Sequence, residues 1–227
     1  MKLSIIIPVY NEHATIRQVI EMINAVPIEK EIIVVDDGSN DGTREILRSL
    51  NTHNITTAFH ESNSGKGTAI RTGLTHVTGD IVIIQDADLE YDPREYPQLI
   101  QPIVEGKAAV VYGSRFLHHL ASKKIYHHFV LGVKLLNLLT YVLYGTRITD
   151  EATCYKAFKS EVIKNINLRC KRFEFCPEIT AKVCKKGYTI YEVPISYRGR
   201  SFKEGKKITW KDGIEAIYTL IKYRFID

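Results

Sequence analysis

Short apolar runs alternate with amphipathic segments along the first half of the chain. The runs are rich in isoleucine and valine and predict strands at residues 3–8, 31–36, 55–60, 80–85 and 108–114. Apolar residues at helical spacing predict helices between them, at residues 14–25, 41–50, 65–77 and 96–105, and Asn40 or Asp41 can cap the second of these. Strands that are apolar on both faces and alternate with helices indicate an α/β fold, with a mainly parallel sheet covered by helices on both faces.

The second half of the chain is more helical. Its pattern predicts a long helix at 123–144, a loop leading into a strand at 147–158, a helix at 177–186, two extended segments at 188–197 and a last amphipathic helix at 210–226. One face of that last helix carries large apolar side chains, namely Trp210, Ile214, Ile217, Ile221 and Phe225. The helix at 123–144 is apolar almost all round, so it is either buried in the core or faces a membrane surface.

The composition and net charge of the chain leave the class of its binding partner open. The chain has 227 residues, 44% of them hydrophobic and 25% charged, which is the composition of an ordinary soluble globular protein. Its net charge of +5 favours anionic partners such as phosphates, acidic lipid or nucleic acid. Lys134 and Asn137 interrupt the most apolar stretch, which makes it a poor membrane span. The four cysteines form no C-x-x-C pair, so buried reduced thiols of a cytosolic protein are favoured over a zinc site.

Carboxylates crowd the end of the fourth predicted strand. In the stretch IVIIQDADLEYDP, residues 81–93, Asp86, Asp88 and Glu90 stand at alternate positions. Alternate residues of an extended segment point the same way, so these like charges repel unless a cation lies among them. Oxygen ligands of this kind suit Mg²⁺ or Mn²⁺.

Other polar residues follow the first two strands and are expected at the same edge of the sheet. Asn11 and Glu12 follow the first strand, and Asp36 and Asp37 follow the second. Capping of the next helix is the alternative for Asp36 and Asp37, but no helix begins close enough to explain Asp86 and Asp88 in that way. The stretch NSGKG at 63–67 opens a helix with glycines and a lysine, which suits phosphate, although it fails the P-loop pattern and an ordinary loop is the alternative.

Five motifs occur in order, each after a predicted strand: PVYNE (8–12), VVDDGSNDGT (34–43), NSGKG (63–67), QDADLEYDP (85–93) and GSR (113–115). Together they closely resemble the family-2 glycosyltransferases of the GT-A fold. Within that family the chain looks like the dolichol-phosphate mannosyltransferase group, which loads a sugar onto a polyprenyl phosphate. The likeness of TDEATCYKAF, FEFCPEITAK and EVPISYRGRSFKEGKKI extends it over nearly the whole chain.

The resemblance implies one catalytic domain, residues 1–227, whose half at 1–115 binds a GDP- or UDP-sugar and whose half at 116–227 binds the acceptor. It implies that the donor is bound by Pro8, Val9, Tyr10, Glu12, Asp36, Asp37, Lys66, Asp86 and Ala87. Mg²⁺ or Mn²⁺ would be held by Asp86, Asp88 and Glu90 and would bridge the donor diphosphate. The acceptor phosphate would meet Arg115, Lys124, His128, Arg200 and Lys206, with His127 and Lys207 nearby.

Two features decide between acceptors. A polyprenyl phosphate is already ionised near pH 7 and needs no general base, whereas a hydroxyl of a glycan or small molecule does. Asp150 is the candidate base for a hydroxyl, and capping a turn is its structural alternative. The stretch KKIYHHFVLG, 123–132, lacks the Arg and Ser that the polyprenyl-phosphate group usually carries there.

The leading hypothesis is an inverting, metal-dependent transfer of one mannose- or glucose-class sugar to a polyprenyl phosphate. The transfer of one sugar per turnover is expected because the Q-x-x-R-W motif of processive synthases is absent. We expect a peripheral enzyme on the cytoplasmic face of a membrane, held by the 125–144 helix. A nucleotide-binding protein without catalysis is disfavoured by the intact Asp86 and Asp88 pair, and nucleic-acid binding is disfavoured by the acids at the sheet edge.

Overall fold

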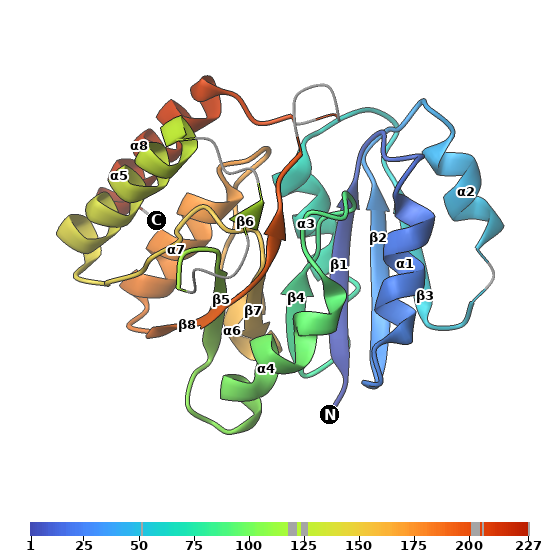
Figure 1. Cartoon of the computed structure of the whole chain (residues 1–227), viewed down its shortest axis with the longest axis horizontal. Coiled ribbons are helices and arrows are strands. Elements are labelled where there is room, and N and C mark those ends of the chain that lie inside the picture. The colour runs from blue at the N-terminus through green and yellow to red at the C-terminus, as the bar shows by residue number, and fades with distance from the viewer. Residues whose placement is uncertain (51, 118–121, 124–126, 201–204, 206, 227) are drawn as a thin grey trace.

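The computed structural model describes residues 1–50, 52–117, 122–123, 127–200, 205 and 207–226, and it leaves out the side chains of residues 122, 123, 127 and 128. A seven-stranded sheet runs through its centre (Figure 1). The strands are β1 (Leu3–Val9), β2 (Lys30–Asp36), β3 (Ile55–Phe59), β4 (Ile81–Ile84), β5 (Val110–Ser114), β7 (Lys156–Lys159) and β8 (Ile190–Pro194).

The order across the sheet is β3-β2-β1-β4-β7-β5-β8. β7 lies between β4 and β5 and runs antiparallel to both, while the other described pairs in this sheet are parallel. β1, β2, β4 and β5 are buried over most of their length, as expected of strands covered on both faces. The mainly parallel α/β sheet predicted from the sequence is confirmed.

Helices cover both faces of the sheet (Figure 1). They are α1 (Ile16–Ala25), α2 (Thr43–Ser49), α3 (Lys66–Leu74), α4 (Tyr96–Val104), which a short 3-10 turn η1 (Pro93–Glu95) precedes, and α6 (Ser160–Lys164). α3 packs closely on β1, because a Cβ on Gly73 would lie 2.5 Å from the side chain of Ile6. The N-cap of α2 is Gly42, so the prediction that Asn40 or Asp41 caps this helix was wrong, although Asp41, one residue earlier, accepts a hydrogen bond from the Thr43 amide at 3.0 Å.

The second half of the chain adds a layer of three helices, α5 (His127–Tyr144), α7 (Phe175–Lys185) and α8 (Trp210–Phe225). They share a small core of Leu136, Ala181, Ala216, Leu220 and Tyr223. A capping box between Thr209 and Asp212 fixes the start of α8. A short parallel pair, β6 (Ser122–Lys123) and β9 (Tyr197–Arg198), forms a second sheet.

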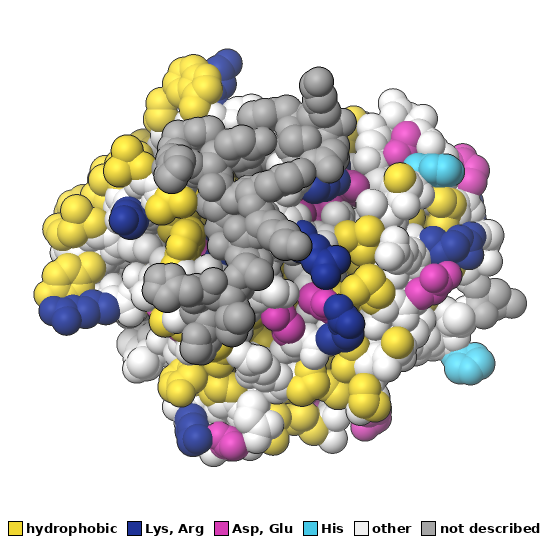
Figure 2. All heavy atoms as spheres, in the orientation of Figure 1, with side chains coloured by type: hydrophobic (Ala, Val, Ile, Leu, Met, Phe, Trp, Pro, Cys, Tyr) yellow, Lys and Arg dark blue, Asp and Glu magenta, His cyan; other side chains and the backbone are white. Residues whose placement is uncertain are grey.

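Much of the apolar surface of α5 and α8 faces outward. On α8, Trp210 is 73% exposed and Phe225 79% exposed, while Ala216, Leu220 and Tyr223 pack inward. On α5, Val133 and Leu136 are buried but Leu131 is 70% exposed. Figure 2 shows hydrophobic side chains gathered over these two helices. One side of the long helix therefore packs in the core, which is one of the two sequence-based alternatives, and its other side is exposed.

Candidate functional site

A cavity of about 1130 Å³ lies beyond the carboxyl ends of β1 and β4, where parallel α/β sheets bind their ligands. Most of the predicted site residues line it: Pro8, Val9, Tyr10, Glu12, Asp37, Lys66, Asp86, Ala87, Asp88, Glu90, Arg115 and Arg200. Asp36 and Asp150 lie behind its wall, buried from solvent. Lys124 and Lys206 lie outside the described residues, as does the side chain of His128.

The loops at this edge are held by one another. Asn11, just after β1, adopts a left-handed backbone with φ 50°, and its side chain accepts a hydrogen bond from the Asn40 amide at 2.9 Å. The hydroxyl of Thr43 accepts from the Glu12 amide at 3.0 Å. These bonds tie the loop after β1 to the loop after β2, so the acids on both loops are brought to one place.

The two acids that follow β2 point in different directions. Asp37 lines the cavity and accepts hydrogen bonds from the amides of Ser64, at 3.0 Å, and Gly65, at 2.7 Å. These two hydrogen bonds fix the backbone of the NSGKG turn, residues 63–67. Asp36 turns away and pairs with Arg44 at 2.7 Å. Of the two residues predicted to read the nucleoside, only Asp37 is placed beside the cavity.

Lysine and arginine side chains balance part of the negative charge of the crowded acids at the end of β4. Lys66 pairs with Asp86. The guanidinium of Arg200 lies 2.6 Å from Asp88 and 3.1 Å from Glu12, and Lys207 lies 2.8 Å from Glu12. Side chains that are distant in sequence thus supply part of the positive charge that the acid pattern requires, because Lys66, Arg200 and Lys207 face the four acids Glu12, Asp86, Asp88 and Glu90.

The charged groups of this cluster alter the pKa of Asp88. Burial and the negative charges of Asp86 and Glu90 raise the pKa of Asp88 to about 7, although Arg200 opposes the shift. The carboxylate of Glu90 accepts from the Tyr197 hydroxyl and from the Arg200 amide, both at 2.8 Å. Glu90 therefore fixes the segment that carries Arg200.

The donor set has the chemistry of a hard-cation site. Asp86 and Asp88 line one cavity, where burial and the negative charge of Asp86 raise the pKa of Asp88. Oxygen ligands and excess negative charge suit Mg²⁺ or Mn²⁺. No three acidic, histidine or cysteine side chains among the described residues are placed to hold one ion together. The acids therefore suit an ion that takes its remaining ligands from a bound diphosphate.

Arg115 and Asp150 form one buried unit. The guanidinium donates to both carboxylate oxygens at 2.6 and 2.7 Å, and the Arg115 amide donates at 3.0 Å. The guanidinium also lies over the ring of Tyr197 at 4.9 Å and that of Phe129 at 5.2 Å. Although burial opposes it, Asp150 raises the pKa of Arg115 above its ordinary value.

Glu151, Cys154 and Cys176 also line the cavity, and no role in the site was predicted for them. The Lys66 ammonium lies 3.0 Å from the Cys154 sulfur. The only sequence signal for them was the likeness of TDEATCYKAF and FEFCPEITAK to the family, which assigned no role to these positions. All four cysteines are free thiols, as predicted.

The far wall of the same cavity is apolar. It is formed by α5 and α8 through Phe129, Val133, Leu136, Trp210, Ile214 and Ile217. The charged residues at the edge of the sheet and the apolar residues of α5 and α8 therefore line the same cavity.

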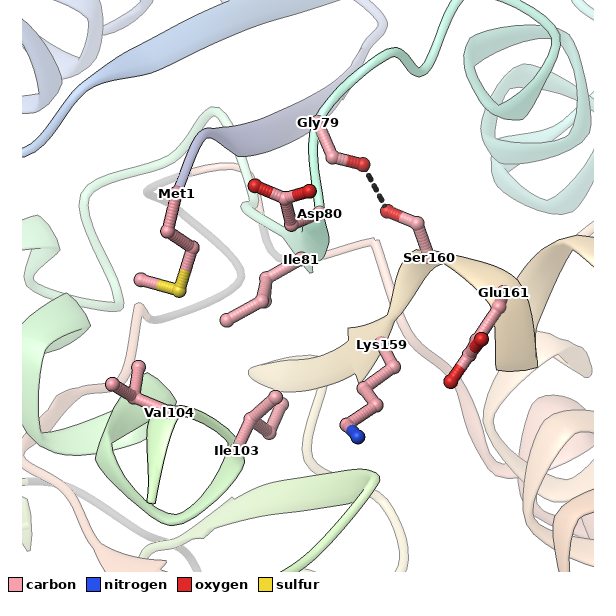
Figure 3. A pocket seen from close by; sticks show the side chains of 9 residues that line it. All are labelled: Met1, Gly79, Asp80, Ile81, Ile103, Val104, Lys159, Ser160 and Glu161. Carbon is pink, nitrogen blue, oxygen red and sulfur yellow. Dashed lines mark hydrogen bonds between the residues drawn. The ribbon is translucent and has the colours of Figure 1, made fainter. Parts of the chain in front are cut away.

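A second cavity, of about 440 Å³, lies at the opposite edge of the sheet. Figure 3 shows Asp80, Lys159 and Glu161 around it, and the Ser160 hydroxyl donating to the Gly79 carbonyl. It lies near the amino ends of β1 and β4, away from the predicted site residues.

Comparison with known proteins identifies the class. A family model described as Glycosyl transferase family 2 matches residues 4–166. The chain belongs to this family of glycosyltransferases, and the resemblance seen in the sequence motifs is confirmed.

Two curated relatives are similar over most of the chain. One is a UDP-N-acetylglucosamine–dolichyl-phosphate N-acetylglucosaminyltransferase of Methanococcus voltae, 30% identical over 96% of this chain and 94% of its own length. The other is an undecaprenyl-phosphate 4-deoxy-4-formamido-L-arabinose transferase of Salmonella paratyphi A, 30% identical over 90% of this chain. The chain spans 62% of the length of that second transferase.

Solved structures confirm the GT-A fold. Mannosyl-3-phosphoglycerate synthase from Rubrobacter xylanophilus matches with a TM-score of 0.76, at 20% identity over 98% of this chain and 72% of that one. Glucosyl-3-phosphoglycerate synthase from Mycobacterium tuberculosis, in a complex with Mn²⁺, UDP and its product, matches with a TM-score of 0.75, at 22% identity over all of this chain and 81% of that one. Within the described residues, no helix is long and apolar enough to cross a bilayer.

Proposed function

We propose that this glycosyltransferase moves one sugar from a nucleoside-diphosphate sugar to a polyprenyl phosphate. The observation that carries the proposal is the shape of the cavity, which joins the acids at the sheet edge to an apolar wall between α5 and α8. The charged end suits a metal–diphosphate group, and the apolar end suits the first isoprene units of a lipid. Both curated relatives have lipid phosphates in their names, which supports the same acceptor class here.

The donor would lie across the loops after β1, β2 and β4. Tyr10 and Asp37 flank the nucleoside end, and Lys66 with Asp86 flanks the diphosphate end. We favour a UDP-sugar over a GDP-sugar, because one relative has a UDP-sugar in its name and a protein of the same fold was crystallised with UDP. When bound to Asp86 and Asp88, Mg²⁺ or Mn²⁺ would neutralise the charge that develops on the diphosphate.

The transfer itself is a displacement at the anomeric carbon. A phosphate oxygen of the lipid forms the new bond to that carbon while the bond to the nucleoside diphosphate breaks, so one such step inverts the configuration. The acceptor is already an anion near pH 7 and no proton has to be removed. Asp150 has both carboxylate oxygens occupied by Arg115, which makes it a poor general base and favours a phosphate over a hydroxyl acceptor.

The lipid acceptor implies a membrane surface. We propose that the exposed apolar side chains of α5 and α8 dip into the cytoplasmic face of a membrane and bring the cavity to the lipid phosphate. The free thiols fit a reducing compartment. Leu131→Glu and Ile214→Glu should each lower vesicle binding in a flotation assay. Val104→Glu, which changes an exposed apolar residue of α4, is the matched control and should not.

The transfer assay tests the proposal directly. Purified protein is given UDP-glucose, UDP-N-acetylglucosamine or GDP-mannose with undecaprenyl or dolichyl phosphate in detergent and Mn²⁺, and the lipid is analysed by mass spectrometry. We expect a glycosylated lipid phosphate with at least one donor, and a loss of about 100-fold or more for Asp88→Asn. Asp80→Asn, at the opposite sheet edge, is the control. Sugar transfer to soluble hydroxyl acceptors alone would refute the lipid acceptor.

A further inference from the structure

Glu151 is a buried acid in the cavity wall that the mechanism above does not use. It follows Asp150 in the loop before β7 and is fully buried. Its amide donates to the Asn137 side chain of α5 at 2.9 Å, and its carbonyl accepts from the Lys156 ammonium at 2.8 Å. The backbone at this position is thus fixed from two sides, which fixes where the carboxyl group can point.

The carboxyl group of Glu151 has no hydrogen-bond partner among the described residues at either oxygen. The Thr180 hydroxyl, which hydrogen-bonds the Tyr112 hydroxyl at 2.9 Å, is near enough to oppose the rise in the pKa of Glu151, but it makes no hydrogen bond of full geometry to the carboxyl group. The Lys156 ammonium is taken up by the Glu151 carbonyl and lies 3.5 Å above the Tyr112 ring. Native proteins rarely leave a buried polar group unpaired, and such groups call for an explanation, of which an absent ligand is one.

The neighbours of Glu151 include charged or polar groups near both ends of the site. Along the wall, Lys66 contacts both Asp86 and the Cys154 sulfur. Cys176 lies within electrostatic reach of both Lys66 and Glu151, and Arg115 lies within reach of Glu151. Glu151 therefore lies within reach of Arg115, on the proposed acceptor side, and of Cys176, which is also within reach of Lys66 at the proposed diphosphate end. In the proposed reaction the transferred sugar moves between these two ends.

The hydrogen-bonding capacity of the Glu151 carboxyl group indicates which part of the substrates it can bind. Burial raises the pKa of Glu151, although Lys156 opposes the shift, so the protonated form is favoured more than usual. A protonated carboxyl both donates and accepts a hydrogen bond. An isoprenoid tail offers neither group, and the nucleoside end is bounded by Tyr10 and Asp37 instead. Hydroxyl and acylamino groups of a sugar offer both.

We propose that Glu151 is a specificity-determining residue that hydrogen-bonds a hydroxyl or acylamino group of the transferred sugar. This inference rests on the proposed donor site. It predicts that Glu151 contributes to the binding of a nucleotide sugar but not to the binding of the bare nucleotide.

The test compares UDP with UDP-glucose and UDP-N-acetylglucosamine, and GDP with GDP-mannose, by calorimetry in Mn²⁺. For the sugar nucleotide that the wild-type protein binds, Glu151→Met should weaken binding about tenfold, the loss expected for one or two hydrogen bonds, and leave the bare nucleotide within about twofold. Glu151→Gln keeps a donor and an acceptor and should lose less. Glu95→Gln, which alters another acid with a buried unpaired oxygen outside the cavity, should change neither.

The unfolding midpoint without ligand supplies a second readout. Glu151→Met removes an unpaired buried polar group and should raise the midpoint, whereas an acid with a structural partner would lower it. Equal losses for nucleotide and sugar nucleotide, no loss at all, or a lowered midpoint would each overturn the assignment. Failure of the wild-type protein to bind any of these nucleotides would instead refute the donor site itself, and the inference with it.

Discussion

The pair formed by Arg115 and Asp150 allows a quantitative prediction. Asp150→Asn keeps the shape of the side chain but removes the charge that balances Arg115. The side chain of Arg115 is only 2% exposed and its guanidinium lies over the rings of Phe129 and Tyr197. Water therefore cannot solvate the positive charge that Asp150 no longer balances. Breaking a buried ion pair by removing one partner typically costs about 3–5 kcal/mol. Since domains are stable by about 5–15 kcal/mol, this single change should remove a large share of the total.

Urea unfolding followed by circular dichroism measures the effect. The matched control is Asp92→Asn, because Asp92 also binds an arginine, Arg94, through both oxygens but at a site where the arginine is 74% exposed. An exposed pair is worth about 1 kcal/mol or less. The double variant Arg115→Met with Asp150→Asn should be less destabilised than Asp150→Asn alone, since no unpaired charge remains. Equal effects of Asp150→Asn and Asp92→Asn would refute the reasoning.

Three further predictions concern charge and backbone. Although burial opposes it, hydrogen bonds lower the pKa of Glu31 to about 2, below its unfolded value, so its contribution to stability should be full above about pH 4.5 and lost as the pH falls toward 2. The stability difference between wild type and Glu31→Gln, measured by urea unfolding from pH 7 to pH 2, should therefore shrink over that window, and a constant difference would contradict this. Arg200→Met should raise the affinity for Mn²⁺ without nucleotide about tenfold in electron paramagnetic resonance titrations, because Arg200 competes for Asp88; equal or weaker affinity would contradict it. Gly65→Ala should lower the unfolding midpoint, since Gly65 has φ 95° and a Cβ there would lie 2.3 Å from the Lys171 carbonyl oxygen; an unchanged midpoint would argue against this close approach.

The pattern of apolar and polar residues was sufficient to predict the strands in the first half of the fold. Strands β1 to β5 lie at the predicted positions within a few residues, because each is an isolated apolar run between helical segments. The antiparallel direction of β7 was not predictable, since a strand buried on both faces carries no alternation and no local signal of direction. The helix α6 was missed because a five-residue helix is too short to show a helical period.

The outward orientation of α8 shows another limit. Its apolar face was visible in the sequence, but the periodicity does not say what that face meets. In the structure Ala216, Thr219 and Leu220 pack inward, and the face with Trp210 and Phe225 is exposed. Only the positions of α5 and α7 decide which side of α8 is covered.

The candidate site was likewise predictable from the sequence only in part. The gathering of Glu12, Asp37, Asp86 and Asp88 followed from their places after parallel strands. The destination of Arg200 did not follow, because its contact with Asp88 spans 112 residues and a loop whose path has no sequence signal. The sequence could likewise not show that Arg115 and Asp150 are partners rather than separate groups.

Nucleotide binding tests the central claim, that the acids at the sheet edge hold a metal–nucleotide group. Thermal unfolding is measured with UDP, GDP or neither, each with and without Mn²⁺, for the wild type and for Asp88→Asn. A ligand at 100 times its dissociation constant stabilises by about 2.7 kcal/mol. We predict that UDP raises the midpoint only when Mn²⁺ is present, and that Asp88→Asn abolishes the shift. An unchanged midpoint with both nucleotides and metal, or an undiminished shift in Asp88→Asn, would contradict the account.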